Sequence, residues 1–355
     1  MVRNNTNRRE KIMEQQLEQQ ELAITRYRPG AWKQAGKAVV ASSAAEVASQ
    51  AGLDWSVSLV DLQAKYFKPV EGTGSSQGQT LVVPTVIPVD KKKAVIKTTP
   101  TGETTAIGVV GNRYKPFQNA EIFGALDSLI DSGDARYAAA GEYDGGAKVW
   151  MLMSLPNEIT VANDPHSAFL LAKTSHDGSS SVVIKPIIER LFCMNQINKL
   201  YRNTNKYTYR LSHTTNSQLS VQDIRNIIQL SYDMVEDYKT IANYLINKKV
   251  DSRESAINYF KKVFPLPSKI EETPYEMLSQ GERKQQTNAQ RARSIAHQIY
   301  SLSPSQENIR HTEFGLWQAV VEYADYNSKG KNLAVKTMSG QSDNIKLKAL
   351  ELLNS

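Results

Sequence analysis

Apolar and polar residues alternate over much of the first two thirds of the chain, as they do in half-buried β-strands. A Pro-Thr-Gly turn at 100–102 joins two of these segments and predicts a β-hairpin. A second hairpin is predicted around Asp144-Gly145-Gly146. The predicted strands cover residues 81–83, 86–89, 94–99, 104–110, 136–142, 148–155, 168–174 and 181–185.

Helical spacing of apolar residues replaces this alternation at one place in the first part and throughout the last third. One helix is predicted after Asn119, which we expect to cap it, with apolar residues from Ile122 to Ile130 on one face. Beyond residue 218, Ser220 is a cap for the first of several helices. These predicted helices cover residues 221–245, 254–263, 288–301, 313–326 and 345–353.

The order of these elements predicts an α+β fold. We expect a mostly antiparallel sheet with a flanking helix in the N-terminal two thirds and a helical C-terminal third, because strands and helices do not alternate regularly. The predicted division is a polar tail or helix at 1–30, a sheet-rich α+β domain at 31–217 and a helical region at 218–355. An oligomerisation helix is the alternative for 1–30, and the sequence leaves open whether the two larger parts fold independently.

Composition favours an anionic partner and a reducing compartment. The 355 residues include 43 Lys and Arg against 36 Asp and Glu, a formal net charge of +7. Cys193 is the single cysteine, which excludes a disulfide scaffold within one chain. The first 21 residues are too polar for a signal peptide, and no apolar run is long enough to span a membrane. We therefore expect a cytoplasmic protein.

The sequence offers no constellation typical of an enzyme, a metal site or a bound cofactor. The five histidines are His166, His176, His213, His297 and His311, and none pairs with another at the spacing of two metal ligands on a helix. Ser175, His176 and Asp177 are adjacent, whereas a catalytic triad converges from separate elements. Either their side chains form hydrogen bonds with the backbone of their own turn, or the turn contacts a ligand. A metal-dependent nuclease using Asp177 or Glu189 remains a third-ranked alternative.

Residues 185–213 have the composition of a nucleic-acid contact. Cations accumulate there with only Glu189 opposing them, and tyrosines lie among them. Cations neutralise phosphates and aromatic rings stack on unpaired bases, so this mixture favours a single strand. The predicted contacts are Lys185, Arg190, Lys199, Arg202, Lys206, Tyr207, Tyr209 and Arg210. The alternative is a solvated helix and loop with half-buried tyrosines.

Several segments, in order, are similar to one family, the phage/plasmid-like proteins of unknown function that are found on bacterial mobile elements. The similarity extends over roughly residues 53–353. The segments are Leu53–Val57, Gly108–Tyr114, Gln118–Glu121, Ala140–Trp150, Ser175–Ser179, Glu189–Asn195, Ser212–Thr214, Thr312–Asp325 and Lys346–Leu350.

This resemblance implies a bacterial or phage cytoplasm and makes DNA metabolism of a mobile element the expected context. The order of hairpin, helix and sheet also resembles, at the level of the fold only, phage single-strand annealing proteins, which assemble as rings or filaments. We therefore expect a homo-oligomeric, non-enzymatic protein that binds or anneals single-stranded DNA in recombination or replication. The alternative is a phage or plasmid factor that contacts proteins or counters a host defence.

Overall fold

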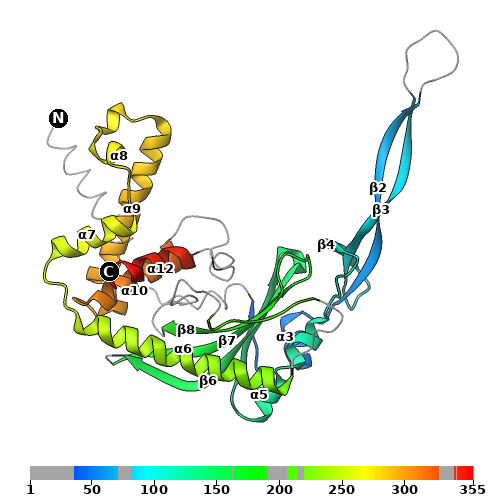
Figure 1. Ribbon diagram of the computed structural model, residues 1–355, viewed down its shortest axis with the longest axis horizontal. Helices are drawn as coiled ribbons and strands as arrows, with labels where there is room; N and C mark the ends of the chain where they lie inside the picture. Colours follow the sequence, from blue (N-terminus) through cyan, green and yellow to red (C-terminus); the bar gives the residue numbers. More distant parts are fainter. Residues whose placement is uncertain are drawn as a thin grey trace, which may run out of the picture.

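The computed structural model describes residues 36–70, 81–161, 163–190, 206–213, 220–327, 340 and 342–354. Figure 1 shows two sheets, a helical lobe at one end and a long arm projecting at the other. The strands precede residue 212 and are antiparallel, and the long helices follow residue 220. The predicted α+β fold is confirmed. The predicted tail at 1–30 and the boundary near 217 lie outside the described residues.

The larger sheet, sheet A, has the strand order β1-β5-β6-β7-β8-β9. Its hairpin of β5 and β6 confirms the one predicted around Asp144-Gly145-Gly146, and the strands run further than their alternation indicated. Gly145 and Gly146 both have positive φ, which lets the chain turn back within three residues. The strands are β1 (Lys37–Ala38), β5 (Arg136–Tyr143), β6 (Lys148–Val161), β7 (Asp164–Ser175), β8 (Val182–Arg190) and β9 (Tyr209–Leu211).

The smaller sheet, sheet B, consists of β2 (Ser56–Val70), β3 (Leu81–Thr98) and β4 (Thr104–Gly111). The predicted hairpin of β3 and β4 is confirmed, with Thr98 opposite Thr104. The separate strand patterns at 81–99 form one strand, which pairs with β2 over almost its whole length. Beyond the part paired with β4, β2 and β3 continue alone as the projecting arm (Figure 1).

Short helices pack beside the sheets. They are α3 (Ala44–Ala51), α4 (Asn119–Gly124) and α5 (Asp127–Asp131). The prediction that Asn119 caps the helix is wrong by one residue, because Gln118 is the N-cap and forms a capping box with Glu121. Asn119 is instead buried, and its amide nitrogen donates to the Leu53 carbonyl at 2.9 Å.

The C-terminal third is helical, as predicted. Its helices are α6 (Val221–Asn247), α7 (Arg253–Val263), α8 (Ser268–Glu272), α9 (Gln280–Leu302), α10 (Glu313–Glu322) and α12 (Asp343–Glu351). The Ser220 hydroxyl caps α6, which confirms that prediction. After α10 the chain continues in π-helical form over Tyr323–Asn327, where a continuous helix had been expected.

Two hydrophobic cores share α6. Near its start, Ile227 belongs to the core between sheet A, sheet B and the short helices. Further along, residues from Met234 to Leu245 belong to the core of the helical lobe, together with Ile159 and Ile188 of sheet A. Because both cores include side chains from each side of residue 217, the sheet-rich and helical parts are packed together through shared interior residues.

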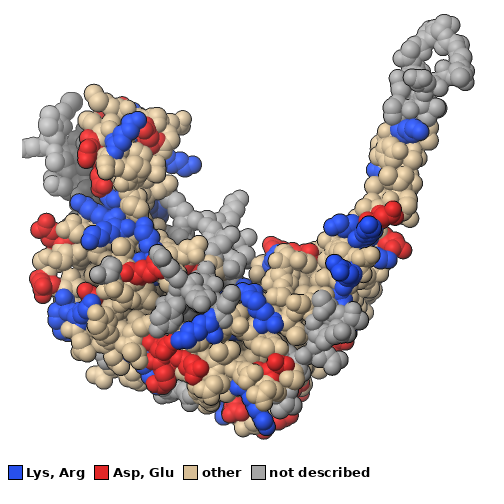
Figure 2. Space-filling model, in the orientation of Figure 1, with Lys and Arg blue, Asp and Glu red and all other residues tan. Residues whose placement is uncertain are grey.

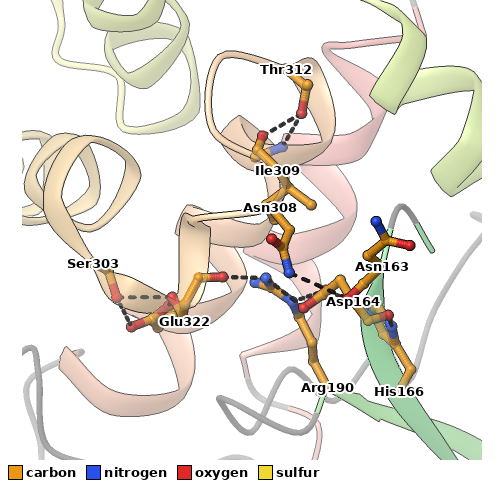
Figure 3. A network of polar contacts seen from close by, with 11 residues as sticks. Asn163, Asp164, His166, Arg190, Ser303, Asn308, Ile309, Thr312 and Glu322 are labelled. Carbon is orange, nitrogen blue, oxygen red and sulfur yellow. Dashed lines mark hydrogen bonds and ion pairs between the residues drawn. The ribbon is translucent and has the colours of Figure 1, made fainter. Parts of the chain in front are cut away.

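A buried polar network ties sheet A to the helical lobe (Figure 3). The Arg190 guanidinium donates to both carboxylate oxygens of Asp164 and to the Ser305 carbonyl. Glu322 accepts from the Ser305 hydroxyl at 2.6 Å, and burial raises the pKa of the Glu322 carboxyl. A buried charge is tolerated only where partners satisfy it, so this network fixes how the two parts meet.

Candidate nucleic-acid interface

One face of sheet A carries a cation from each of five adjacent strands. Lys173 lies opposite Val183, which lies opposite Arg210, and in the neighbouring row Leu171 lies opposite Lys185. Residues directly opposite one another point to the same face. The pairings of β5, β6 and β7 add Arg136 and Lys148 to that face. We call Arg136, Lys148, Lys173, Lys185 and Arg210 the basic face.

The geometry of the strands spaces these charges across the sheet. Neighbouring strands lie about 5 Å apart, so the basic face is about 19 Å wide from β5 to β9. Its cations lie in four different rows, and Lys173 and Arg210 share one of them. Arg136 and Arg210 are exposed, whereas Lys173 and Lys185 are partly buried. Burial lowers the pKa of the Lys173 ammonium, Asp343 opposes this effect and Arg210 adds to it. Lys173 and Arg210 lie in one row, two strands apart, so their positive charges repel one another.

Aromatic side chains accompany these cations. Trp150 and Phe169 point to the same face as Lys173 and Arg136 respectively, because their rows are shared. Tyr143, opposite Lys148, is partly exposed, and the Lys148 ammonium lies 5.9 Å from the centre of its ring. Phe169 is also partly exposed, but Trp150 is fully buried. Tyr143 and Phe169 also pack against a small core cluster on this face that includes Trp150, so each ring is only partly accessible.

Glu189, Asp144 and Asp177 lie at the margins of the basic face, whereas Asp343 of α12 lies near Lys173. Glu189 lies opposite Ser167, beyond the rows that hold the cations. Asp144 and Asp177 both accept from the Lys148 ammonium, at 3.1 and 3.0 Å. These two contacts raise the pKa of Lys148 and offset its charge. Figure 2 shows further groups of Lys and Arg along the hollow side of the molecule, from the helical lobe to the base of the arm.

Two of the sequence-predicted contacts, Lys185 and Arg210, belong to the basic face. Lys206 does not, because its ammonium is paired with Asp237 of α6 at 2.7 Å. The Tyr207 hydroxyl donates to the same carboxylate, and its ring is 9% exposed within the core of the helical lobe. Tyr209 packs against the core on the other side of the sheet. Both tyrosines are therefore packing residues here, not free stacking surfaces.

Arg190 requires a correction. Its side chain is 1% exposed and its guanidinium is held by Asp164 and Ser305, so it does not reach phosphates in this structure. A charge run read from sequence does not distinguish a solvated arginine from one that pairs with an acid 26 residues away. Lys199 and Arg202 lie outside the described residues.

The predicted ligand-touching turn is largely internal. The Ser175 hydroxyl donates to the Ser180 carbonyl and accepts from the Ser180 amide, both at 2.8 Å, and Ser175 is buried. His176 is also buried. Only Asp177 is partly exposed, and it accepts from the Ser179 amide at 2.9 Å. The turn therefore forms hydrogen bonds with its own backbone, as in the first of the two alternatives. Ser175 and His176 are buried and do not face the surface.

Residues from four separate similar segments converge beside this turn. His176 is hydrogen-bonded through Nε2 to the Asn119 side chain at 2.9 Å. The ring of His213 stacks on Tyr114, with centroids 4.9 Å apart, and the Tyr114 hydroxyl donates to the Ser175 carbonyl. At Gly108 any Cβ would lie 2.6 Å from the Asp177 Cα, so only glycine fits. These residues join sheet B to sheet A.

Burial keeps the histidines of this junction neutral at ordinary pH. It lowers the pKa of His176 to about 4, and the neighbouring His213 and Lys97 act in the same direction. The pKa of His213 is also lowered by burial. A neutral, enclosed imidazole holds neighbouring strands in place and is a poor acid or base toward an external substrate.

Within the described residues, no group of three His, Cys, Asp or Glu side chains lies close enough together to hold a metal ion. Across the same part of the chain, no helix is both long and apolar enough to cross a membrane.

Arg136, Lys148 and Lys173 were not predicted from the sequence as members of one surface. They are separated along the chain and come together only through strand pairing. Alternate residues of a strand point to the same face of the sheet, so the sequence shows which residues of one strand share a face. The pairing register is needed to show which residues of different strands share it.

Comparison with known families gives one match. The family model described as a domain of unknown function (DUF932) matches residues 106–350. No curated protein and no solved structure matches the chain. The matched region starts within β4 and includes β5 to β9 and the helices that follow, so the basic face lies inside it and the arm precedes it.

Proposed function

The chain belongs to the DUF932 family, and we propose that it is a nucleic-acid-binding protein of a phage or plasmid that holds single-stranded DNA on the basic face of sheet A. The proposed role is strand binding or annealing in recombination or replication, without an enzymatic step. Self-assembly into a homo-oligomer, as a ring or filament, is part of the proposal.

The observation that carries this proposal is that Arg136, Lys173 and Arg210 share one face of sheet A with the partly exposed rings of Tyr143 and Phe169. Cations that follow a backbone and rings that stack on bases are the two components of single-strand binding without sequence preference. A duplex hides its base faces, so the rings favour a single strand. The net charge of +7 supports an anionic partner.

The test removes three charges of the basic face while keeping side-chain size similar. We expect the triple variant Arg136→Gln, Lys173→Gln, Arg210→Gln to bind a labelled single-stranded oligonucleotide at least about tenfold more weakly than the parent. Each lost phosphate contact also reduces the salt dependence of binding by about 0.7 in the log–log slope. Fluorescence anisotropy at several salt concentrations measures both quantities.

A matched control changes the same net charge on the other side of sheet A. Arg225 and Lys239 lie on α6, which packs against the opposite face, and Lys249 follows its end. Their replacement by glutamine is expected to weaken binding much less. An equal loss of affinity in the two triple variants would show that binding depends on net charge and not on the basic face. Unchanged binding by the first variant would show that the basic face is not the binding site.

The projecting arm favours a second function, contact with another protein. Phe67 is 66% exposed, and Val86 and Ile87 are about half exposed. Exposed apolar groups of this kind mark contact surfaces. A phage or plasmid factor that binds a host protein would use this surface in place of the basic face. Loss of partner capture on removal of the arm, with no DNA binding by the parent, would support this alternative.

A further inference from the structure

The arm is a ribbon of two strands, and many of its apolar side chains remain exposed. The large apolar residues exposed on its described outer half are Tyr66, Phe67, Val83, Val86 and Ile87. Two-stranded hairpins are only marginally stable in water without a further layer or strand. Lys65 and Lys68 are the charged residues of the described outer half, 63–68 and 83–88, so the surface is mainly apolar and favours a protein over a nucleic acid.

The free surface of the arm includes one edge of β2. Of the described strands, only β3 pairs with β2. At the base, the Gln118 side chain occupies this edge: its amide donates to the Val57 carbonyl at 2.9 Å and its oxygen accepts from the Val57 amide at 3.0 Å. Toward the tip, Pro69 has no N–H to donate. The open edge therefore runs from Ser58 to Lys68.

We propose that two copies of this chain form a two-fold dimer by pairing the open edges of β2, antiparallel to one another. This contact closes a dimer, and the ring or filament proposed above would need a second, heterologous contact. It does not depend on nucleic-acid binding. An open edge is a template for a further strand, and an isologous contact needs a surface that is complementary to itself. The edge of β2 has that property.

Matching the two open edges end to end places Gln63 at the axis. Asp61 then faces Lys65 of the partner subunit, and the relation is repeated by symmetry. Val60 faces Tyr66 of the partner subunit, and both are 44% exposed in the single chain. Leu59 faces Phe67 of the partner subunit, the most exposed apolar residue of the arm's described outer half. Charge and apolar surface are thus complementary in one register.

The irregularity of β2 lies at the same midpoint. The pairing with β3 shifts between Asp61 and Gln63, where β2 bends. Two regular ladders are therefore expected, one on each side of the axis, each joining 58–61 of one copy to 65–68 of the other. Asp61 also pairs with Lys93 of its own chain at 2.5 Å, but its side chain remains 83% exposed and so retains an oxygen for the second copy.

Charge reversal tests this register. We expect the parent to show a monomer–dimer equilibrium in sedimentation velocity, and Lys65→Asp to raise the dissociation constant about tenfold, because Asp61 would face an aspartate at both symmetric positions. Asp61→Lys is expected to do the same. The double variant Asp61→Lys, Lys65→Asp restores the opposite charges, and its dissociation constant is expected to return to within about threefold of the parent.

Lys93→Ala is the matched control, because it removes the intrachain partner of Asp61 and leaves the proposed contact intact. It is expected to dimerise as the parent does, and circular dichroism shows that each variant is folded. A parent that stays monomeric at about 100 µM, single variants that dimerise like the parent, or a double variant that is no better than the singles would each overturn the proposal. A monomer whose arm variants lose nucleic-acid binding would also overturn it and assign the arm to nucleic acid.

Discussion

Two fully buried histidines hold their positions as neutral side chains. His166 lies beside Asp164 and Arg190 and contacts the ring of Tyr238, while His176 lies between Asn119 and Trp55. Burial lowers the pKa of each to about 4. Their protonation in the folded protein costs free energy because each imidazolium would be enclosed without water.

Stability is therefore expected to depend on pH below neutrality. Above the unfolded pKa of about 6.5 both histidines are neutral in both states and stability is constant. As pH falls from about 6.5 to about 4 the unfolded chain takes up protons first, so the free energy of unfolding falls by up to roughly 3 kcal/mol per histidine. Urea unfolding at pH 7.5 and pH 5 measures this, and His176→Gln is expected to reduce the difference. Equal stability of the parent at both values would contradict it.

The buried Arg190–Asp164 pair is expected to be costly to break. Asp164→Ala leaves a guanidinium without its carboxylate in the interior, and the expected loss of unfolding free energy is about 3–5 kcal/mol. Asp61→Ala, which breaks an exposed pair, is expected to cost less than about 1 kcal/mol. Urea denaturation measures the free energy of unfolding of both variants. Similarly small losses in the two would show that the buried network does not hold sheet A and the helical lobe together.

At the scale of elements, sequence patterns predict that a strand or helix exists better than they predict where it begins and ends. The hairpins around residues 100–102 and 144–146 and the Ser220 cap follow from turn and cap residues, which act locally. The length of β3 and the position of Asn119 depend on partners far along the chain, such as β2 and Leu53. The arm was not predicted, because an exposed ribbon gives short apolar patterns that read as separate strands.

The arm is expected to be dispensable for folding of the remainder. Its outer half lies beyond β4 and is largely exposed, so replacing residues 64–87 by an Asn-Gly turn removes little of either core. The expected change in unfolding free energy is within about 0.5 kcal/mol when the parent is measured as a monomer. A loss of several kcal/mol in urea denaturation would show that the arm is an integral part of sheet B.

At the scale of the whole molecule, the candidate site was predictable only in part. Lys185 and Arg210 followed from composition, but Arg190, Tyr207 and Tyr209 are used for packing. A segment's composition indicates which groups are available, whereas the sheet decides which of them share a face. The similar segments around Asn119, His176 and His213 are likewise brought together by the fold, in the interior, where they hold sheet B on sheet A.

The claim that the basic face of sheet A holds single-stranded DNA is tested most directly by anisotropy of the parent protein with single-stranded and duplex oligonucleotides of one sequence across a salt series. The expected result is tighter binding to the single strand, with an affinity that falls linearly against the logarithm of salt concentration. The absence of binding to either oligonucleotide at low salt, or a preference for the duplex, would contradict it.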